Sequence, residues 1–207
     1  MLEFYTNPMS RGQIIRWALE EVGQPYEEHI ISYGAEMKSE PYISINPMGK
    51  VPAIRHDGQV LTECPAIISY LAETFPDAGL LPEPTERADY LRWFFYTAGP
   101  FEQAVTSKSL GWEPSTEQSA MAGFGSYELV MKVVDDLLSS RDYVCGDRFT
   151  AVDVYLGSQI LFGLNFGSVP KLASFQAYAG RMAARPASQK AKARDDELLA
   201  AQQATNG

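Results

Sequence analysis

The chain has 207 residues, 45% of them hydrophobic and 21% charged, which is ordinary for a globular protein that buries its own core. The formal net charge of −9, with no sustained run of Lys or Arg, argues against a nucleic-acid partner. No apolar run approaches the ~18 residues that span a bilayer, and the N-terminal residues carry no secretory pattern, so the sequence predicts a cytoplasmic protein with no membrane partner.

The first segments of the chain alternate between strand-like and helix-like patterns. Residues 2–5 predict a short strand. Ser10 can then cap a helix whose apolar stripe follows a helical period and stops at Gly23. Residues 25–32 look extended again. A strand, a crossover helix and a second strand predict a parallel pair.

A hairpin and another helix follow. Residues 51–55 predict a strand that runs into Asp57-Gly58, the dipeptide of a tight two-residue turn. The next strand should therefore return antiparallel. Pro65 suits the first turn of a helix over residues 66–75, because its fixed φ fits there and its missing N–H is not needed. Together these segments predict a small α/β domain.

Strand signals end after a proline-rich segment. The later helix-like segments are 88–110, 116–140, 150–161, 170–184 and 187–202. We therefore expect a first domain over residues 1–77, a linker over 78–86 and an all-helical domain over 87–207.

Two features of the first half could bind a ligand. Glu63 and Cys64 stand where a helix begins, and a helix start offers unpaired N–H groups and a positive dipole end. The pair could receive the zwitterionic end of an amino acid, or Glu63 could simply steady the helix. Val51-Pro52 starts a strand and could be a cis bond, although position alone favours trans because only about 5–6% of X–Pro bonds are cis.

Four segments, taken together, resemble cytosolic glutathione transferases of the bacterial type with a serine-type N-terminal motif. They are FYTNPMSRGQIIRWALEEVGQPYEE, INPMGKVPAI, LTECPAIISYLAETFP and YVCGDRFTAVDV. The resemblance implies a thioredoxin-like N-terminal domain and an all-α C-terminal domain, assembled as a homodimer. It also implies an enzyme that conjugates reduced glutathione to small hydrophobic electrophiles through an activated thiolate. A glutathione-dependent disulfide or peroxide reductase, or a non-catalytic glutathione-binding protein, are the alternatives on the same fold.

The resemblance also assigns the glutathione site. Pro52 would be cis, and the Val51 backbone would pair with the cysteinyl part of the tripeptide. Glu63 and Cys64 would hold the γ-glutamyl end, and Lys50 could reach the glycyl carboxylate. Position 64 is commonly serine in the family, so here a weak S–H replaces a hydroxyl.

Two side chains compete for activation of the glutathione thiol. The segment EFYTNPMS aligns without gaps to the serine-type pattern, which favours Ser10, although a serine at a helix start is usually only a cap. Tyr5 is the alternative, where tyrosine-type members carry their hydroxyl, and Arg11 or backbone N–H groups are a third. The electrophile would lie on an apolar floor, for which the candidates are Met9, Phe101, Trp112, Phe162 and Phe166.

The remaining polar residues predict structure, not chemistry. Thr150 and Asp153 have the spacing of a capping box, and we assign them to folding. The only cysteines are Cys64 and Cys145, which cannot form a disulfide framework. The two histidines have no companions at ligand spacing, so no metal site is expected.

Overall fold

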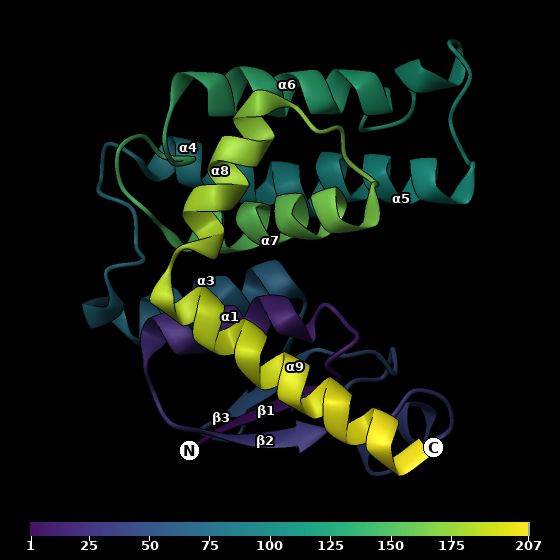
Figure 1. The fold of residues 1–207 in the computed structure, drawn as a ribbon, viewed down its shortest axis with the longest axis vertical. Coiled ribbons are helices and arrows are strands. Elements are labelled where there is room, and N and C mark those ends of the chain that lie inside the picture. Colours follow the sequence, from purple (N-terminus) through teal and green to yellow (C-terminus); the bar gives the residue numbers. More distant parts are fainter. Residues whose placement is uncertain (207) are drawn as a thin grey trace. The chain divides into compact units, whose positions relative to one another are not determined.

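The computed structural model describes residues 1–206 and divides the chain into two compact units (Figure 1). The first unit comprises Met1–Gly79 together with the segment from Arg185 onward, and the second comprises Leu80–Ala184. The sequence placed the C-terminal segment with the other helices, over residues 87–207. Its contacts instead group it with the first unit.

A four-stranded sheet forms the centre of the first unit. Its strands are β1 (Leu2–Thr6), β2 (Tyr26–Ile30), β3 (Ala53–His56) and β4 (Gln59–Thr62). They lie in the order β2-β1-β3-β4, with β1 parallel to β2 and antiparallel to β3. His56 pairs with Gln59 across Asp57 and Gly58, whose φ values of 49° and 82° suit a type I′ hairpin. The predicted parallel pair and hairpin are therefore confirmed.

Helices cover both faces of this sheet. They are α1 (Gly12–Val22), the short η1 (Glu36–Lys38), α2 (Tyr42–Ile45), α3 (Cys64–Thr74), η2 (Pro76–Ala78) and α9 (Pro186–Asn206). α1 ends as expected at Gly23, which has a φ of 70° and donates its N–H to the Leu19 carbonyl at 3.0 Å. α1 and α3 lie over one face of the sheet, and α9 packs along α1 (Figure 1).

Alternation along β1 assigns its side chains to the two faces. Phe4 is buried beneath α1, where the guanidinium carbon of Arg16 lies 5.3 Å from its ring centroid. Tyr5 must then point to the opposite face, since successive side chains of a strand alternate. There it packs in a buried cluster with Met37 of η1 and Tyr42 of α2.

The second unit is built from helices. They are α4 (Arg87–Tyr96), the π-helical turn η3 (Thr97–Phe101), α5 (Glu102–Leu110), the short η4 (Gln118–Ala120), α6 (Tyr127–Ser140), α7 (Ala151–Phe166) and α8 (Ala173–Ala183). α7 is buried on most of its sides and packs against α4 and α8, so it forms the centre of this unit.

One helix is shorter than its sequence pattern suggests. Helical spacing over residues 116–140 predicted a single helix, but α6 begins only at Tyr127. Gly125 has a φ of 68°, which a helix cannot accommodate, and Ser126 then caps α6 by accepting the Leu129 N–H at 3.1 Å. The prediction was therefore wrong for its first half, because the apolar period alone did not register the break.

The start of α7 confirms the predicted structural role of Thr150 and Asp153. The fully buried Asp153 carboxylate accepts the backbone N–H groups of Val144 and Thr150, both at 2.8 Å. It also accepts the hydroxyls of Tyr178 at 2.9 Å and Thr150 at 3.1 Å. Burial nevertheless raises the pKa of Asp153 to about 6. Among residues 1–206, none of the helices combines the length and apolarity that crossing a membrane requires.

Candidate active site

The N-terminal ends of α1 and α3 meet at one corner of the first unit, which we call the helix corner and define as Arg11, Gly12, Glu63 and Cys64. The buried Cys64 sulfur lies 3.9 Å from the Arg11 carbonyl oxygen, so the two helix starts are in contact. Glu63 is exposed and has a φ of 66°, which is unfavourable for a side chain larger than glycine. In the described part of the chain, no side chain caps α3 at this position.

A helix start without a side-chain cap can bind an anion. Its first N–H groups lack intrahelical acceptors, and the dipole adds partial positive charge. Pro65 occupies the first turn as predicted, where its lack of an N–H leaves no helical bond unmade. The exposed Glu63 carboxylate adds negative charge beside this positive end. The corner therefore suits a ligand end that carries both charges.

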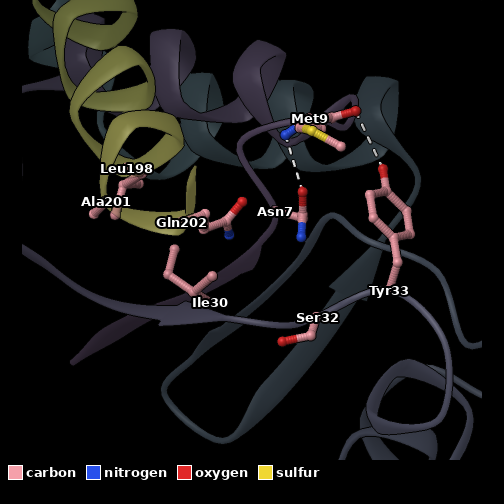
Figure 2. A pocket seen from close by; sticks show the side chains of 8 residues that line it. All are labelled: Asn7, Met9, Ile30, Ser32, Tyr33, Leu198, Ala201 and Gln202. Carbon is pink, nitrogen blue, oxygen red and sulfur yellow. Dashed lines mark hydrogen bonds between the residues drawn. The ribbon is translucent and has the colours of Figure 1, made fainter. Parts of the chain in front are cut away.

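The loop between β1 and α1 is held by Asn7, which the sequence analysis missed. Asn7 is buried, accepts the Met9 N–H at 2.9 Å and donates its amide to the Ile31 carbonyl at 2.9 Å. The Tyr33 hydroxyl donates to the Met9 carbonyl at 3.2 Å, which ties the segment after β2 to the same loop (Figure 2). These bonds fix the backbone that precedes Ser10.

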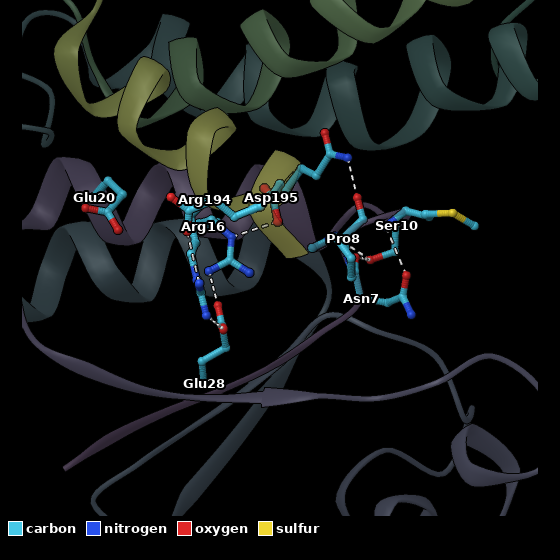
Figure 3. A network of polar contacts seen from close by, with 12 residues as sticks. Asn7, Pro8, Ser10, Arg16, Glu20, Glu28, Arg194 and Asp195 are labelled. Carbon is cyan, nitrogen blue, oxygen red and sulfur yellow. Dashed lines mark hydrogen bonds and ion pairs between the residues drawn. The ribbon is translucent and has the colours of Figure 1, made fainter. Parts of the chain in front are cut away.

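Ser10 directly precedes the N-cap of α1, which is Arg11 and not Ser10 as predicted. Its hydroxyl accepts the Gly12 N–H at 2.9 Å and donates to the Asn7 carbonyl at 2.7 Å (Figure 3). The hydroxyl hydrogen can rotate toward another acceptor without moving the oxygen, because only the C–O torsion changes. A Cβ on Gly12 would lie 1.9 Å from the Thr6 hydroxyl oxygen, so any larger residue here would require the Thr6 side chain to move.

Tyr5, the competing candidate, is engaged elsewhere. Its hydroxyl donates to the Glu3 carboxylate, and its ring stacks on His29 with centroids 4.7 Å apart. Burial, together with the hydrogen bond to Glu3, raises the pKa of Tyr5 to about 12. Because Tyr5 points to the face of the sheet opposite α1, this geometry favours Ser10 as the thiol activator.

The Val51-Pro52 peptide bond is cis, as the family resemblance implied and position alone did not. The preceding Lys50 carbonyl accepts the Tyr42 hydroxyl at 2.5 Å and the Asn46 amide at 2.7 Å. The Lys50 side chain is exposed, and Val51 is half-buried. The two hydrogen bonds to the Lys50 carbonyl therefore fix the backbone of this segment on the side that faces the protein. A second cis bond, Glu40-Pro41, was not anticipated.

Asn46 makes the same kinds of hydrogen bonds as Asn7. It is buried, accepts the N–H of Met48 two residues later at 3.1 Å, and uses its amide to reach Lys50. Both asparagines open the tripeptide Asn-Pro-Met. An asparagine that accepts the N–H two residues on forms an Asx turn. The repeated tripeptide was thus a sequence signal for the two loops that flank the site.

The five candidates for the apolar floor differ in exposure and in the unit to which they belong. Met9 is in the first unit and is 65% exposed. In the second unit, Trp112 and Phe166 are 70% and 83% exposed, Phe162 is half-buried, and Phe101 is fully buried. Full burial of Phe101 favours a core role for that residue. That these five side chains form one floor stays a prediction.

The described residues, 1–206, include no group of three or more His, Cys, Asp or Glu side chains placed to hold a metal ion. His29 stacks on Tyr5, and His56 Nδ1 lies 2.9 Å from the Tyr70 hydroxyl oxygen. Cys145 is buried, and burial raises the pKa of its thiol to about 11.

Similar proteins are known for both units. Residues 4–82 match the family described as glutathione S-transferase, N-terminal domain. The chain is 32% identical over 153 residues to glutathione S-transferase GstA of Escherichia coli O157:H7, which covers 70% of this chain and 73% of that relative. It is 30% identical over 162 residues to maleylacetoacetate isomerase of Pseudomonas aeruginosa, which covers 74% and 76%. A solved sphingomonad glutathione S-transferase complexed with glutathione has a TM-score of 0.75 at 28% identity and covers 94% of this chain and 98% of that chain.

Proposed function

The chain belongs to the glutathione S-transferase family, and from that premise we propose how its own residues bind and activate glutathione. It is a glutathione transferase, which joins the sulfur of reduced glutathione to small hydrophobic electrophiles. Glutathione is its co-substrate. We propose which residues carry this activity, how the enzyme assembles and which electrophile it uses.

The γ-glutamyl end of glutathione binds at the helix corner. Its carboxylate accepts the N–H groups of Cys64 and Ala66 at the start of α3, where the helix dipole favours an anion. Its ammonium pairs with the exposed Glu63 carboxylate. The observation that supports this assignment is the exposed Glu63 at an uncapped helix start, in contact with α1 through Cys64.

The middle of the tripeptide pairs with the Val51 backbone. Support comes from the cis bond to Pro52 and from the two side chains that hold the Lys50 carbonyl from behind. The exposed Lys50 ammonium then reaches toward the glycyl carboxylate. An extended peptide against this edge places its central thiol toward the start of α1.

Ser10 lowers the pKa of the bound thiol. A free thiol has a pKa of about 8.5 and is mostly protonated at neutral pH. A hydrogen bond to the thiolate, at ~1.5–3 kcal/mol, corresponds to a shift of about one to two units. The proton leaves to solvent, and the thiolate attacks the electrophilic carbon while the leaving group departs with its electron pair. Ser10 is favoured because the Tyr5 hydroxyl is bonded to Glu3 on the other face of the sheet.

The test is the thiol pKa of bound glutathione, read from thiolate absorbance against pH. Ser10→Ala should raise that pKa by about one to two units and reduce turnover of chlorodinitrobenzene near pH 6.5 by about 10–100-fold. Ser10→Thr, which retains a hydroxyl, should restore most of both. Tyr5→Phe should change neither. A pKa that stays low in Ser10→Ala and rises in Tyr5→Phe would reverse the assignment.

A glutathione-dependent isomerase is the second candidate, because one relative at 30% identity is a maleylacetoacetate isomerase. Such a reaction would use the same site but return glutathione unchanged after each turnover. Measuring glutathione consumed per product formed separates the two. The reductase alternative is tested by turnover with disulfides and hydroperoxides, which oxidise two glutathione molecules to their disulfide.

We also propose that the enzyme acts as a homodimer in the cytoplasm. The proposal is supported by its similarity to cytosolic glutathione transferases. The chain has a mass of 22.9 kDa. Sedimentation equilibrium should therefore give about twice that mass, and a mass equal to one chain at assay concentrations would contradict the dimer.

A further inference from the structure

The Lys50 carbonyl oxygen lies just before the cis bond of Val51-Pro52 and accepts two hydrogen bonds from side chains. One comes from the hydroxyl of Tyr42, the first residue of α2, at 2.5 Å. The other comes from the amide of Asn46, the C-cap of α2, at 2.7 Å. We call Tyr42 and Asn46 the α2 donors. Because a carbonyl oxygen has two lone pairs, these two donors use its full hydrogen-bonding capacity.

We propose that the α2 donors are positioning residues for glutathione, which orient the Lys50–Val51 peptide group so that the Val51 N–H faces the bound tripeptide. This inference rests on the proposed function, because it takes the Val51 backbone as the partner of the cysteinyl part of glutathione. It adds a role in binding for two buried side chains that act on the ligand only through a peptide group.

The geometry of the peptide group carries this argument. Within residues 1–206 the cis bonds are Glu40-Pro41 and Val51-Pro52, so the Lys50–Val51 bond is trans. In a planar trans peptide, the C=O of one residue and the N–H of the next point in opposite directions. The Lys50 C=O points toward the α2 donors. The Val51 N–H therefore points away from them, and whatever fixes the carbonyl also fixes this N–H.

The hydroxyl of Tyr42 is held in place by its ring. Tyr42 is 1% exposed and belongs to a buried cluster of the first unit that includes Tyr5 and Met37. Its ring centroid lies 6.0 Å from that of Tyr5. Burial raises the pKa of Tyr42 to about 12, so the hydroxyl keeps its proton and donates throughout the pH range of an enzyme assay. The sheet side of the first unit thus fixes one donor.

The amide of Asn46 is fixed by the turn that the same side chain forms. Its oxygen accepts the Met48 N–H at 3.1 Å, which leaves the NH2 group to face the Lys50 carbonyl. Asn7 forms the same turn, but its amide donates to the Ile31 carbonyl and so ties its loop to another segment of the scaffold. Of the two Asn-Pro-Met turns, only that of Asn46 directs its amide to the peptide group beside the predicted ligand.

The rest of the loop before Val51 is held as well. Lys38 Nζ donates to the Met48 carbonyl at 3.0 Å and to the Gly49 carbonyl at 2.6 Å. Gly49 has a φ of 55°, and a Cβ there would lie 2.7 Å from the Met37 carbonyl oxygen, so the loop packs closely on the backbone of η1. The three carbonyls that precede Val51 are therefore all bonded by the protein. A loop ordered in this way before the ligand arrives lowers the entropic cost of binding.

The test removes one donor and compares the result with loss of the same kind of bond elsewhere. Tyr42→Phe deletes a bond from a tyrosine hydroxyl to a backbone carbonyl. The matched control is Tyr127→Phe, because the Tyr127 hydroxyl donates to the Ser168 carbonyl at 2.9 Å in the second unit. We would measure KM for glutathione and kcat with saturating chlorodinitrobenzene, and the Kd of S-methylglutathione by calorimetry.

Tyr42→Phe should raise KM for glutathione and the Kd of S-methylglutathione by about 3–10-fold, as loss of one modest hydrogen bond allows. At saturating glutathione, kcat should stay within about twofold of wild type, because the lost interaction serves binding and not the chemical step. Tyr127→Phe should match the wild type in all three constants. A purely structural role of Tyr42 predicts instead that both variants lose stability and neither changes KM.

The second variant, Asn46→Asp, isolates the other donor. The carboxylate keeps an acceptor for the Met48 N–H but turns an oxygen toward the Lys50 carbonyl, so both constants should rise by about 10-fold or more. Wild-type values of KM and Kd in Tyr42→Phe and Asn46→Asp would overturn this inference and leave the proposed function standing. A wild-type enzyme that does not bind S-methylglutathione would overturn both.

Discussion

The starts of α3 and α7 are both helix N-termini with an acidic residue in or beside the first turn, yet they are built in opposite ways. At α7, Asp153 is fully buried and accepts four hydrogen bonds, two of them from backbone N–H groups. At α3, Glu63 is exposed, has a positive φ and caps no N–H group in the described chain. The start of α7 is capped by side chains of the protein, whereas in the described chain no side chain caps the start of α3.

The difference teaches how an acidic residue at a helix start can be interpreted. A carboxylate buried among its own donors stabilises the fold, since breaking that set leaves buried groups unpaired. A carboxylate left exposed, on a backbone conformation that costs free energy, has no such structural purpose and indicates binding. Four predictions test this contrast.

The largest effect should come from Asp153→Asn. The amide nitrogen would replace one of the two carboxylate oxygens, so its two hydrogens would face either the donors of Val144 and Tyr178 or those of Thr150. We expect the free energy of unfolding to fall by about 2–4 kcal/mol, measured by urea denaturation at pH 7. Asp147→Asn, at an exposed position in the same loop, is the matched control and should change it by less than about 0.5 kcal/mol. Equal losses of unfolding free energy in the two variants would show that the buried Asp153 stabilises the fold no more than the exposed Asp147.

The second prediction concerns pH. The folded pKa of Asp153, about 6, lies above its ordinary value of 3.8, so between these values the folded state holds a proton that the unfolded state has lost. Stability from this group is therefore full below about pH 4 and is lost as pH rises through 6. The difference in unfolding free energy between wild type and Asp153→Asn should be larger at pH 5 than at pH 7, by on the order of 1 kcal/mol. Burial also raises the pKa of Asp195 to about 6, but that group is common to both proteins and cancels in the difference.

The third prediction is that replacing Glu63 by glycine raises stability and weakens glutathione binding. Glu63→Gly should relieve the positive φ and stabilise the first unit by up to about 1 kcal/mol. It should also weaken glutathione binding by about 10–100-fold, because the ammonium loses its partner. Glu63→Gln is the control, since it should weaken binding without the gain in thermal stability. Loss of stability in Glu63→Gly would mean that Glu63 is a structural cap after all.

The smallest effect is expected from Cys64→Ser. The Cys64 sulfur makes a weak contact, 3.9 Å from the Arg11 carbonyl oxygen, and a hydroxyl is a stronger donor. We expect glutathione to bind about two- to threefold more tightly, measured by calorimetry, as one additional modest hydrogen bond allows. A loss of affinity would show that the thiol packs against α1 in a way that serine cannot replace.

Features that depend on neighbours in the chain were predictable. The Asp57-Gly58 turn, the stop at Gly23 and the Thr150–Asp153 capping box each involve residues within a few positions of one another. The cis bond at Pro52 was predictable only through the family resemblance. Local sequence therefore predicted the first unit's sheet and the position of Glu63 at a helix start.

Features that depend on partners distant in the sequence were not predictable. The sequence left Tyr5 as an alternative to Ser10, and only the strand pairing shows that Tyr5 points to the face opposite α1. Asn7 is fixed by Ile31, on another segment. The grouping of the C-terminal helix with the first unit could not be predicted, because its partner Arg16 lies 179 residues before Asp195. A pattern of residues specifies which side of a helix is buried, but not which element packs against that side.

The sequence by itself determined the strands, their directions and the helix start beside Glu63, since turns, caps and periodicity act over a few residues. Only the tertiary structure decided which hydroxyl faces α1, that α9 belongs to the first unit, and that a cavity opens beside Met9. Those outcomes depend on buried charges and packed side chains brought together from opposite ends of the chain, and no local rule specifies such pairs.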